Sequence, residues 1–252
     1  MNLNYTEADN KFRKEIKDFI KDNLSQEAQK RVFNGGKYTK DEIIKWQKAL
    51  FREGFFANNW PKEYGGCEWT PMQRYIFDQE TALSNTPEII PFGVTMVGPV
   101  IIEFGTDNQK ERFLPDLLSG KKIAAYGLTE PSSGSDALSA KTHAQLSKDK
   151  KFYILNGEKQ FISNGGWADV FTILAQIDKN KFSAFIVEKN TEGLTVGSEE
   201  KKMGVKGSST TSLKFNDAKI PSENLLYKVG KGAEIAFSAL NIGRYKLAAA
   251  TV

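Results

Sequence analysis

The hydrophobic periodicity of this chain changes near Ile123, and this change restricts the folds that the sequence allows. Before it, apolar residues such as Phe12, Ile16 and Phe19 recur at helical spacing and predict amphipathic helices. After it, short apolar runs such as "DVFTILAQ" (169–176) predict strands. We therefore expect an α+β fold in which helices and strands occupy separate parts of the chain.

Local signals place the borders of these parts. Gly120 ends the last helix of the first part, and Asn156-Gly157, between two strand-like runs, is typical of a β-hairpin turn. Helical spacing returns near Ala233 and has no stop signal before Val252, so we expect the sequence to be a piece of a longer protein. The predicted organisation is an all-α N-terminal domain over residues 1–121, an antiparallel β domain over residues 122–230, and a helix over residues 231–252.

Composition argues against several classes of protein. The net charge of the 252 residues is only +4 and the basic residues are dispersed, which does not favour a nucleic-acid partner. No run approaches the ~18 to 20 apolar residues of a membrane span, and none is expected. Cys67 is the single cysteine, so no internal disulfide can form, and a reducing, cytoplasmic location fits. The lone His143 cannot build a metal site by itself.

The stretch "YGLTEPSSGSD" (126–136) is the first candidate site. Pro131 cannot donate to a sheet ladder, so a strand must end before it. Gly134 can take positive φ and allow a ligand to approach the backbone, while the serine hydroxyls beside free N–H groups are typical of an anion-binding nest. The residues alone leave an ordinary β-turn as the alternative.

Long motifs in this sequence resemble the acyl-CoA dehydrogenase family over essentially the whole chain. The stretches are "AYGLTEPSSGSD", "LNGEKQFISNGGWAD", "EKKMGVKGSSTTSLKFNDAKIPSENLL", "ALNIGRYKLAAA", "WPKEYGG" and "FGTDNQKERFLPDLLSGKKIAAYGLTEP". The middle stretches are most similar to the very-long-chain branch, and the N-terminal part to bacterial large-subunit forms. The resemblance implies an N-terminal helical domain, a β-barrel-like antiparallel middle domain, and a C-terminal four-helix bundle of which this sequence holds the first helix.

The resemblance also implies an FAD site built from two segments. The residues it assigns to the cofactor are Tyr126, Leu128, Thr129, Gly134, Ser135, Phe161, Ile162 and Ser163. Ser135 would bond the pyrophosphate or ribityl region, and Ser163 would place a hydroxyl near the flavin N5. Phe161 stands where the family usually has tryptophan, and its ring can still pack on the flavin. Plain β-core is the alternative for Phe161 and Ile162, and Glu130 and Asp136 are expected to be structural.

Substrate contacts follow from the same resemblance. Ser135, Asn241, Arg244 and Met96 are the candidates, Asn241 and Arg244 because they share a face of the last helix near the CoA, and Met96 because it matches the acyl pocket. An exposed polar face and ordinary core packing are the respective alternatives. No catalytic residue is assigned, because the helix position that carries the base in some members is Gly243 here.

The implied activity is FAD-dependent α,β-dehydrogenation of an acyl-CoA thioester to the 2,3-enoyl-CoA, of the fatty-acid β-oxidation type. An electron-transferring flavoprotein is the implied electron acceptor, and a homotetramer or homodimer is the implied assembly. Residues 1–252 by themselves are expected to be inactive, since the base would lie beyond Val252. A non-catalytic flavin-binding subunit of a heteromeric relative, and a flavin monooxygenase on the same fold, are the alternatives.

Overall fold

The computed structural model describes residues 5–87, 92–178, 181–205 and 207–240. The chain divides into two compact units, Met1–Ile90 and Pro91–Val252, each with its own core. The last predicted helix is described over residues 232–240. Asn241 and Arg244, which are predicted to lie on this helix, are outside the described residues. The border that the sequence predicts at residue 121 remains a prediction.

The first unit is helical. Its helices are α1 (Glu7–Asn23), α2 (Gln26–Phe33), α3 (Lys40–Arg52) and α4 (Pro71–Leu83), with a 3-10 turn at Lys62–Tyr64. Thr6, Thr39 and Thr70 each close a capping box with the residue three positions later, which satisfies main-chain N–H groups at the helix start. Buried aromatic rings join the helices: the Phe19 and Trp46 ring centroids are 5.3 Å apart.

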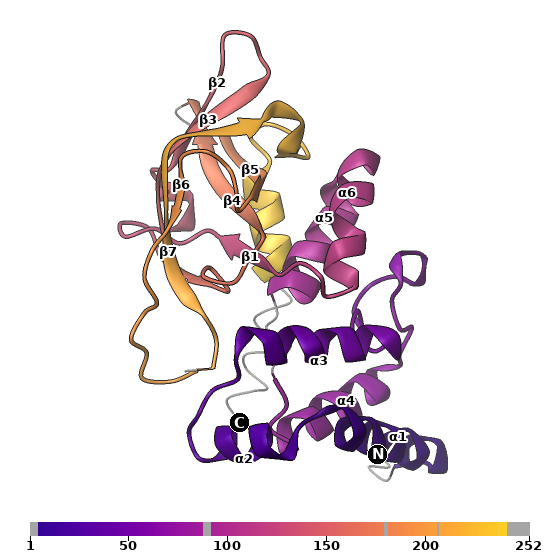
Figure 1. Cartoon of the computed structure of the whole chain (residues 1–252). Coiled ribbons are helices and arrows are strands. Elements are labelled where there is room, and N and C mark those ends of the chain that lie inside the picture. Colours follow the sequence, from indigo (N-terminus) through magenta and orange to yellow (C-terminus); the bar gives the residue numbers. More distant parts are fainter. Residues whose placement is uncertain (1–4, 88–91, 179–180, 206, 241–252) are drawn as a thin grey trace. The chain divides into compact units, whose positions relative to one another are not determined.

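The second unit starts with helices and continues as a sheet (Figure 1). A π-helix at Phe92–Val97 leads into α5 (Gly98–Phe104) and α6 (Asp107–Leu118). The strands are β1 (Ala124–Gly127), β2 (His143–Leu146), β3 (Phe152–Ser163), β4 (Val170–Ile177), β5 (Lys181–Glu188), β6 (Leu194–Val196), β7 (Thr210–Pro221) and β8 (Leu225–Leu226). Short 3-10 turns lie at Ala137–Ser139 and Ser222–Asn224. The predicted α+β class is confirmed.

The strands form one mixed sheet in the order β6-β7-β3-β2-β4-β5-β8, with β1 paired to β4. Most pairs are antiparallel, as predicted, but β4 runs parallel to both β1 and β2. Among the described residues the sheet does not close into a barrel, because β6 and β8 end the order. A parallel pair needs a long crossover connection, and the segment between β1 and β4 provides it. The hydrophobic periodicity of the sequence predicts the strands, but it does not predict that β1 and β4 pair in parallel.

The hairpin predicted at Asn156-Gly157 is wrong, because both residues lie inside the twelve-residue strand β3. The turn that joins β2 to β3 is at Ser147–Phe152, where the Ser147 N–H donates to the Phe152 carbonyl over 2.8 Å. Gly157 has φ 146°, and a Cβ there would lie 2.7 Å from the Thr142 Cα. The glycine therefore allows the chain just before β2 to approach β3 closely, and it does not reverse the chain direction.

Candidate functional site

Main-chain and side-chain hydrogen bonds bring the two predicted flavin segments together. The Gln160 N–H, next to Phe161, donates to the Thr129 carbonyl over 2.9 Å. The Lys159 ammonium donates to the Leu128 carbonyl over 3.2 Å. The end of β1 and the last third of β3 therefore lie side by side, although they are separated by about thirty residues of sequence.

A β-bulge on β3 presents Phe161. Lys159 pairs with Leu213 of β7 and Ile162 with Thr211, so one extra residue is accommodated on β3 between these pairs. Phe161 has φ 58°, in the left-handed region that is unfavourable for a bulky residue. Its side chain is 58% exposed, whereas the neighbouring Ile162 is buried. Ile162 is thus buried as a β-core residue would be, whereas Phe161 is not part of the core, because the bulge directs its ring to the surface.

The β1 end of the site is more buried. Tyr126 and Leu128 are buried and Thr129 is half-buried. The Tyr126 hydroxyl is enclosed, and no hydrogen-bond partner for it exists among the described residues. Burial raises the pKa of this hydroxyl, so it is a neutral donor. An enclosed hydroxyl without a partner is uncommon, and it leaves one donor at this end of the site.

The serine-rich loop after Pro131 reaches the surface. Ser132, Gly134 and Ser135 are exposed, and among the described residues their main-chain N–H groups have no main-chain acceptor. Gly134 does not use the positive φ that a glycine can take, and a Cβ there would meet nothing within 4 Å. Ser133 is buried, and its hydroxyl is used internally, because it donates to the Asp136 carbonyl over 2.7 Å. The free donors therefore come from the outer part of the loop.

A buried ion pair lies behind both segments. The Lys159 ammonium is 2.7 Å from Glu130 Oε1, and the two side chains are 0% and 3% exposed. The Glu130 carboxylate also accepts the main-chain N–H groups of Lys141 and, over 3.0 Å, of Thr142. Burial by itself would raise the pKa of Glu130, but the charge of Lys159 and these hydrogen bonds hold it below its ordinary value. These contacts agree with the structural role expected for Glu130.

Sequence reasoning missed a second polar network, which holds the turn after Ser163. The Asn164 side chain donates to the Ala124 carbonyl over 3.1 Å, and its own backbone has φ 65°. The Ser209 hydroxyl accepts the Gly166 N–H over 3.0 Å and donates to Glu199 over 2.6 Å. The "SNGG" run is the signal that could have indicated this tight turn, since asparagine and glycine tolerate positive φ.

The remaining predicted residues lie elsewhere. Met96 is buried in the π-helix, which packs against β1. Cys67 is half-buried in the helical unit, where burial raises the pKa of its thiol to about 11. The described residues contain no group of His, Cys, Asp and Glu that could hold a metal ion. No helix in the described part of the chain is long and apolar enough to cross a membrane.

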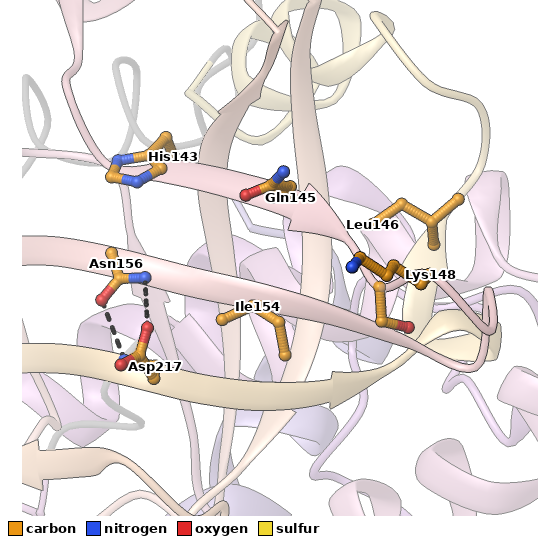
Figure 2. A pocket seen from close by; sticks show the side chains of 8 residues that line it. His143, Gln145, Leu146, Lys148, Ile154, Asn156 and Asp217 are labelled. Carbon is orange, nitrogen blue, oxygen red and sulfur yellow. Dashed lines mark hydrogen bonds between the residues drawn. The ribbon is translucent and has the colours of Figure 1, made fainter.

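A separate groove of about 260 Å³ runs over β2, β3 and β7. His143, Asn156 and Asp217 line it (Figure 2). The Asn156 amide donates to Asp217 Oδ1 over 3.0 Å, and the Asp217 N–H donates back to Asn156 Oδ1 over 2.9 Å. None of the residues predicted to bind cofactor or substrate lines this groove.

Comparisons with known proteins identify the family of the chain. A family model described as "Acyl-CoA dehydrogenase, N-terminal domain" matches residues 6–121, and one described as "Acyl-CoA dehydrogenase, middle domain" matches residues 125–218. The chain is 46% identical over 213 residues to the "Probable acyl-CoA dehydrogenase" of Bacillus subtilis (strain 168), covering 84% of this chain and 36% of that protein.

Two further relatives agree. The chain is 49% identical over 220 residues to the human "Very long-chain specific acyl-CoA dehydrogenase, mitochondrial", covering 83% of this chain and 33% of that protein. A crystal structure of an acyl-CoA dehydrogenase complexed with FAD from Bacillus anthracis matches with TM-score 0.82 and 40% identity, covering 97% of this chain and 42% of that chain. The chain thus spans about a third of the length of the two curated relatives. On the order and extent of these matches, the chain belongs to the acyl-CoA dehydrogenase family, of which it carries the N-terminal and middle domains.

Proposed function

We propose that this chain forms the flavin-holding part of an FAD-dependent acyl-CoA dehydrogenase, which converts an acyl-CoA thioester to the 2,3-enoyl-CoA. The observation that carries the proposal is Phe161: an exposed aromatic ring kept in a left-handed backbone conformation at a β-bulge. Such strain is unfavourable for the fold and is typical of functional sites. The Bacillus anthracis relative is complexed with FAD, which supports FAD as the cofactor that this site binds.

The described residues fit a flavin. The Phe161 ring offers a flat apolar surface to a heteroaromatic ring. The buried Tyr126 hydroxyl has no protein partner among the described residues and can donate to a polar ring edge. The outer loop offers N–H groups and the hydroxyl of Ser135 to a phosphate or sugar. The apolar face, the neutral donor and the polar loop therefore complement the flat ring, the polar ring edge and the phosphate or sugar of FAD.

Each residue has a proposed task. Tyr126, Leu128, Thr129, Phe161, Ile162 and Ser163 hold and orient the ring system, and Gly134 and Ser135 hold the phosphate or ribityl part. Bound FAD would supply the acceptor for the hydride that leaves the substrate. Ile162 and Leu128, which are buried, keep water away from the ring side of the site. We assign no catalytic base to this chain.

The finer assignments are proposals from family resemblance. Met96 is proposed to line the acyl pocket, and Ser135, Asn241 and Arg244 to contact the CoA side. We also propose domain borders at residues 121 and 230 and a cytoplasmic location. The proposed assembly is a homo-oligomer, and the proposed electron acceptor is an electron-transferring flavoprotein.

The test is flavin binding by the purified protein. We expect the protein, after incubation with FAD and gel filtration, to retain a visible flavin band that is shifted from that of free FAD. Phe161→Ala is expected to lose the band and Phe161→Trp to keep it. A well-folded protein that retains no flavin, as judged by circular dichroism and the visible spectrum, would contradict the proposal.

A further inference from the structure

The Lys159–Glu130 ion pair joins every part of the proposed flavin site. Lys159 lies two residues before Phe161 in β3, and Glu130 directly follows Thr129. The ammonium contacts both the Leu128 carbonyl and the Glu130 carboxylate, over 3.2 and 2.7 Å. One side chain therefore ties β3 to the end of β1 at the point where both segments turn toward the site.

The carboxylate of Glu130 closes the base of the serine-rich loop. It accepts the N–H groups of Lys141 and Thr142, which follow the loop, while Glu130 itself precedes the loop. The main chain of Glu130 also exchanges hydrogen bonds with that of Ser133, over 2.9 and 3.1 Å. The two ends of the loop that carries Ser132, Gly134 and Ser135 are thus held together at one carboxylate.

Stability does not account for charges at these positions. A fully buried ion pair loses much of its attraction to desolvation, and apolar replacements of similar volume are often neutral or stabilising. The arrangement is also directional: a carboxylate is needed where two N–H groups converge, and an ammonium where a carbonyl and a carboxylate meet. What the pair supplies is a fixed distance between three chain segments, which apolar packing does not specify as sharply.

We propose that Lys159 and Glu130 are positioning residues that hold the two flavin-binding segments in register, although neither touches the cofactor. The proposal rests on the proposed function, and it extends that function to two buried residues behind the site. The flavin loop and the Phe161 bulge are then one preorganised unit, since a binding site keeps its geometry only when the groups behind it are fixed.

The test is a double variant, Lys159→Met with Glu130→Gln. It removes both charges and the link from β3 to Leu128, and the glutamine oxygen can still accept the Thr142 N–H. A variant that changes Lys159 alone is not used, because it would leave the buried Glu130 carboxylate without its charged partner. FAD affinity is measured by quenching of flavin fluorescence, well below the unfolding temperature of each variant. We expect about tenfold weaker binding or more, by analogy with the loss of groups that orient metal ligands, and altered visible circular dichroism of the flavin that remains bound.

A matched control comes from the helical unit. Arg13 Nη1 lies 2.7 Å from Glu80 Oε1, and these side chains are 20% and 3% exposed. Arg13→Met with Glu80→Gln removes a partly buried ion pair far from β1 and β3 in sequence, and we expect unchanged FAD affinity. Equal loss of affinity in both double variants, or unchanged affinity in the Lys159→Met, Glu130→Gln protein, would overturn the proposal. If that protein does not fold, Glu130→Asp replaces it, with the same readouts and a smaller expected loss.

Hydrogen exchange without FAD separates this proposal from the proposed function. We expect residues 128–142 and 159–163 of the double variant to exchange faster than in the unaltered protein, with the rest of the sheet unchanged. Failure of the unaltered protein to bind FAD would refute the proposed function, and the exchange result would still decide whether the ion pair positions the two segments. Unchanged exchange in both segments would refute the positioning role.

Discussion

Replacing Phe161 separates what this residue does for the fold from what it does for the site. Its φ of 58° is unfavourable for any side chain with a Cβ, but not for glycine. We therefore compare Phe161→Ala, which keeps the strained backbone conformation, with Phe161→Gly, which relieves it. Both variants remove the aromatic ring.

The structure fixes the expected magnitudes. The side chain is 58% exposed, so less than half of it is buried. With ~200 Å² for a phenylalanine and ~25 cal/mol per Å², the lost burial is about 2 kcal/mol at most. A left-handed conformation costs a residue with a Cβ roughly 1 to 2 kcal/mol, which glycine avoids. Phe161→Ala should therefore lower the free energy of unfolding by about 1–2 kcal/mol, well under the ~3–5 kcal/mol of a buried phenylalanine. Phe161→Gly should leave it within about 1 kcal/mol of the unaltered protein.

Urea unfolding followed by circular dichroism gives the stabilities, and fluorescence quenching gives FAD affinity. We expect both variants to lose FAD affinity together, although only the alanine variant loses stability. A glycine variant less stable than the alanine variant would refute the strain argument. A glycine variant that binds FAD as tightly as the unaltered protein would refute the role of the ring.

Three further predictions concern the sheet and the chemistry. Gly157→Ala should lower the free energy of unfolding by about 2–4 kcal/mol, because the new Cβ would collide with Thr142 and the φ of this residue is 146°. Urea unfolding measures this loss. Gly134→Ala, whose Cβ would have open space around it, is the near-neutral control. Because the folded state holds the pKa of Glu130 below its ordinary 4.5, its contribution to stability is present above pH 4.5 and lost as the pH falls. The stability difference between the unaltered protein and Glu130→Gln should therefore shrink on acidification, and a constant difference would contradict this. Residues 1–252 supplied with FAD should not bleach the flavin on adding acyl-CoA, since the loop carboxylate Glu130 is bound to Lys159; bleaching that a glutamate-to-glutamine change abolishes would show a base within the chain.

The sequence predicted the kinds of element well because periodicity is a local property. The amphipathic stripes of the helices and the buried runs of β4 and β5 each follow from residues a few positions apart. It misplaced Asn156-Gly157 for the same reason. That pair is a favourable turn in isolation, and only the approach of Thr142 shows why glycine is needed inside a strand.

The site divides in the same way. Family resemblance named both predicted flavin segments, while local chemistry predicted a polar loop and left an ordinary β-turn as the alternative. The sequence could not show that Phe161 is exposed while Ile162 is buried, because the bulge arises from the pairing of β3 with β7, fifty residues later. It also gave no sign that Lys159, a charged residue in a strand, is completely buried. A buried charge needs a partner, and its partner Glu130 is twenty-nine residues away in sequence.

The sequence by itself therefore determined which segments are helices and which are strands, since these depend on neighbouring residues, and the family resemblance proposed which stretches bind the flavin. Only the tertiary structure decided that the sheet is mixed and not closed, that one ring faces outward, and that one ion pair supports both segments. These features depend on contacts between residues far apart in the chain, and their free energy is set by burial and hydrogen-bond partners that exist only once the chain has folded.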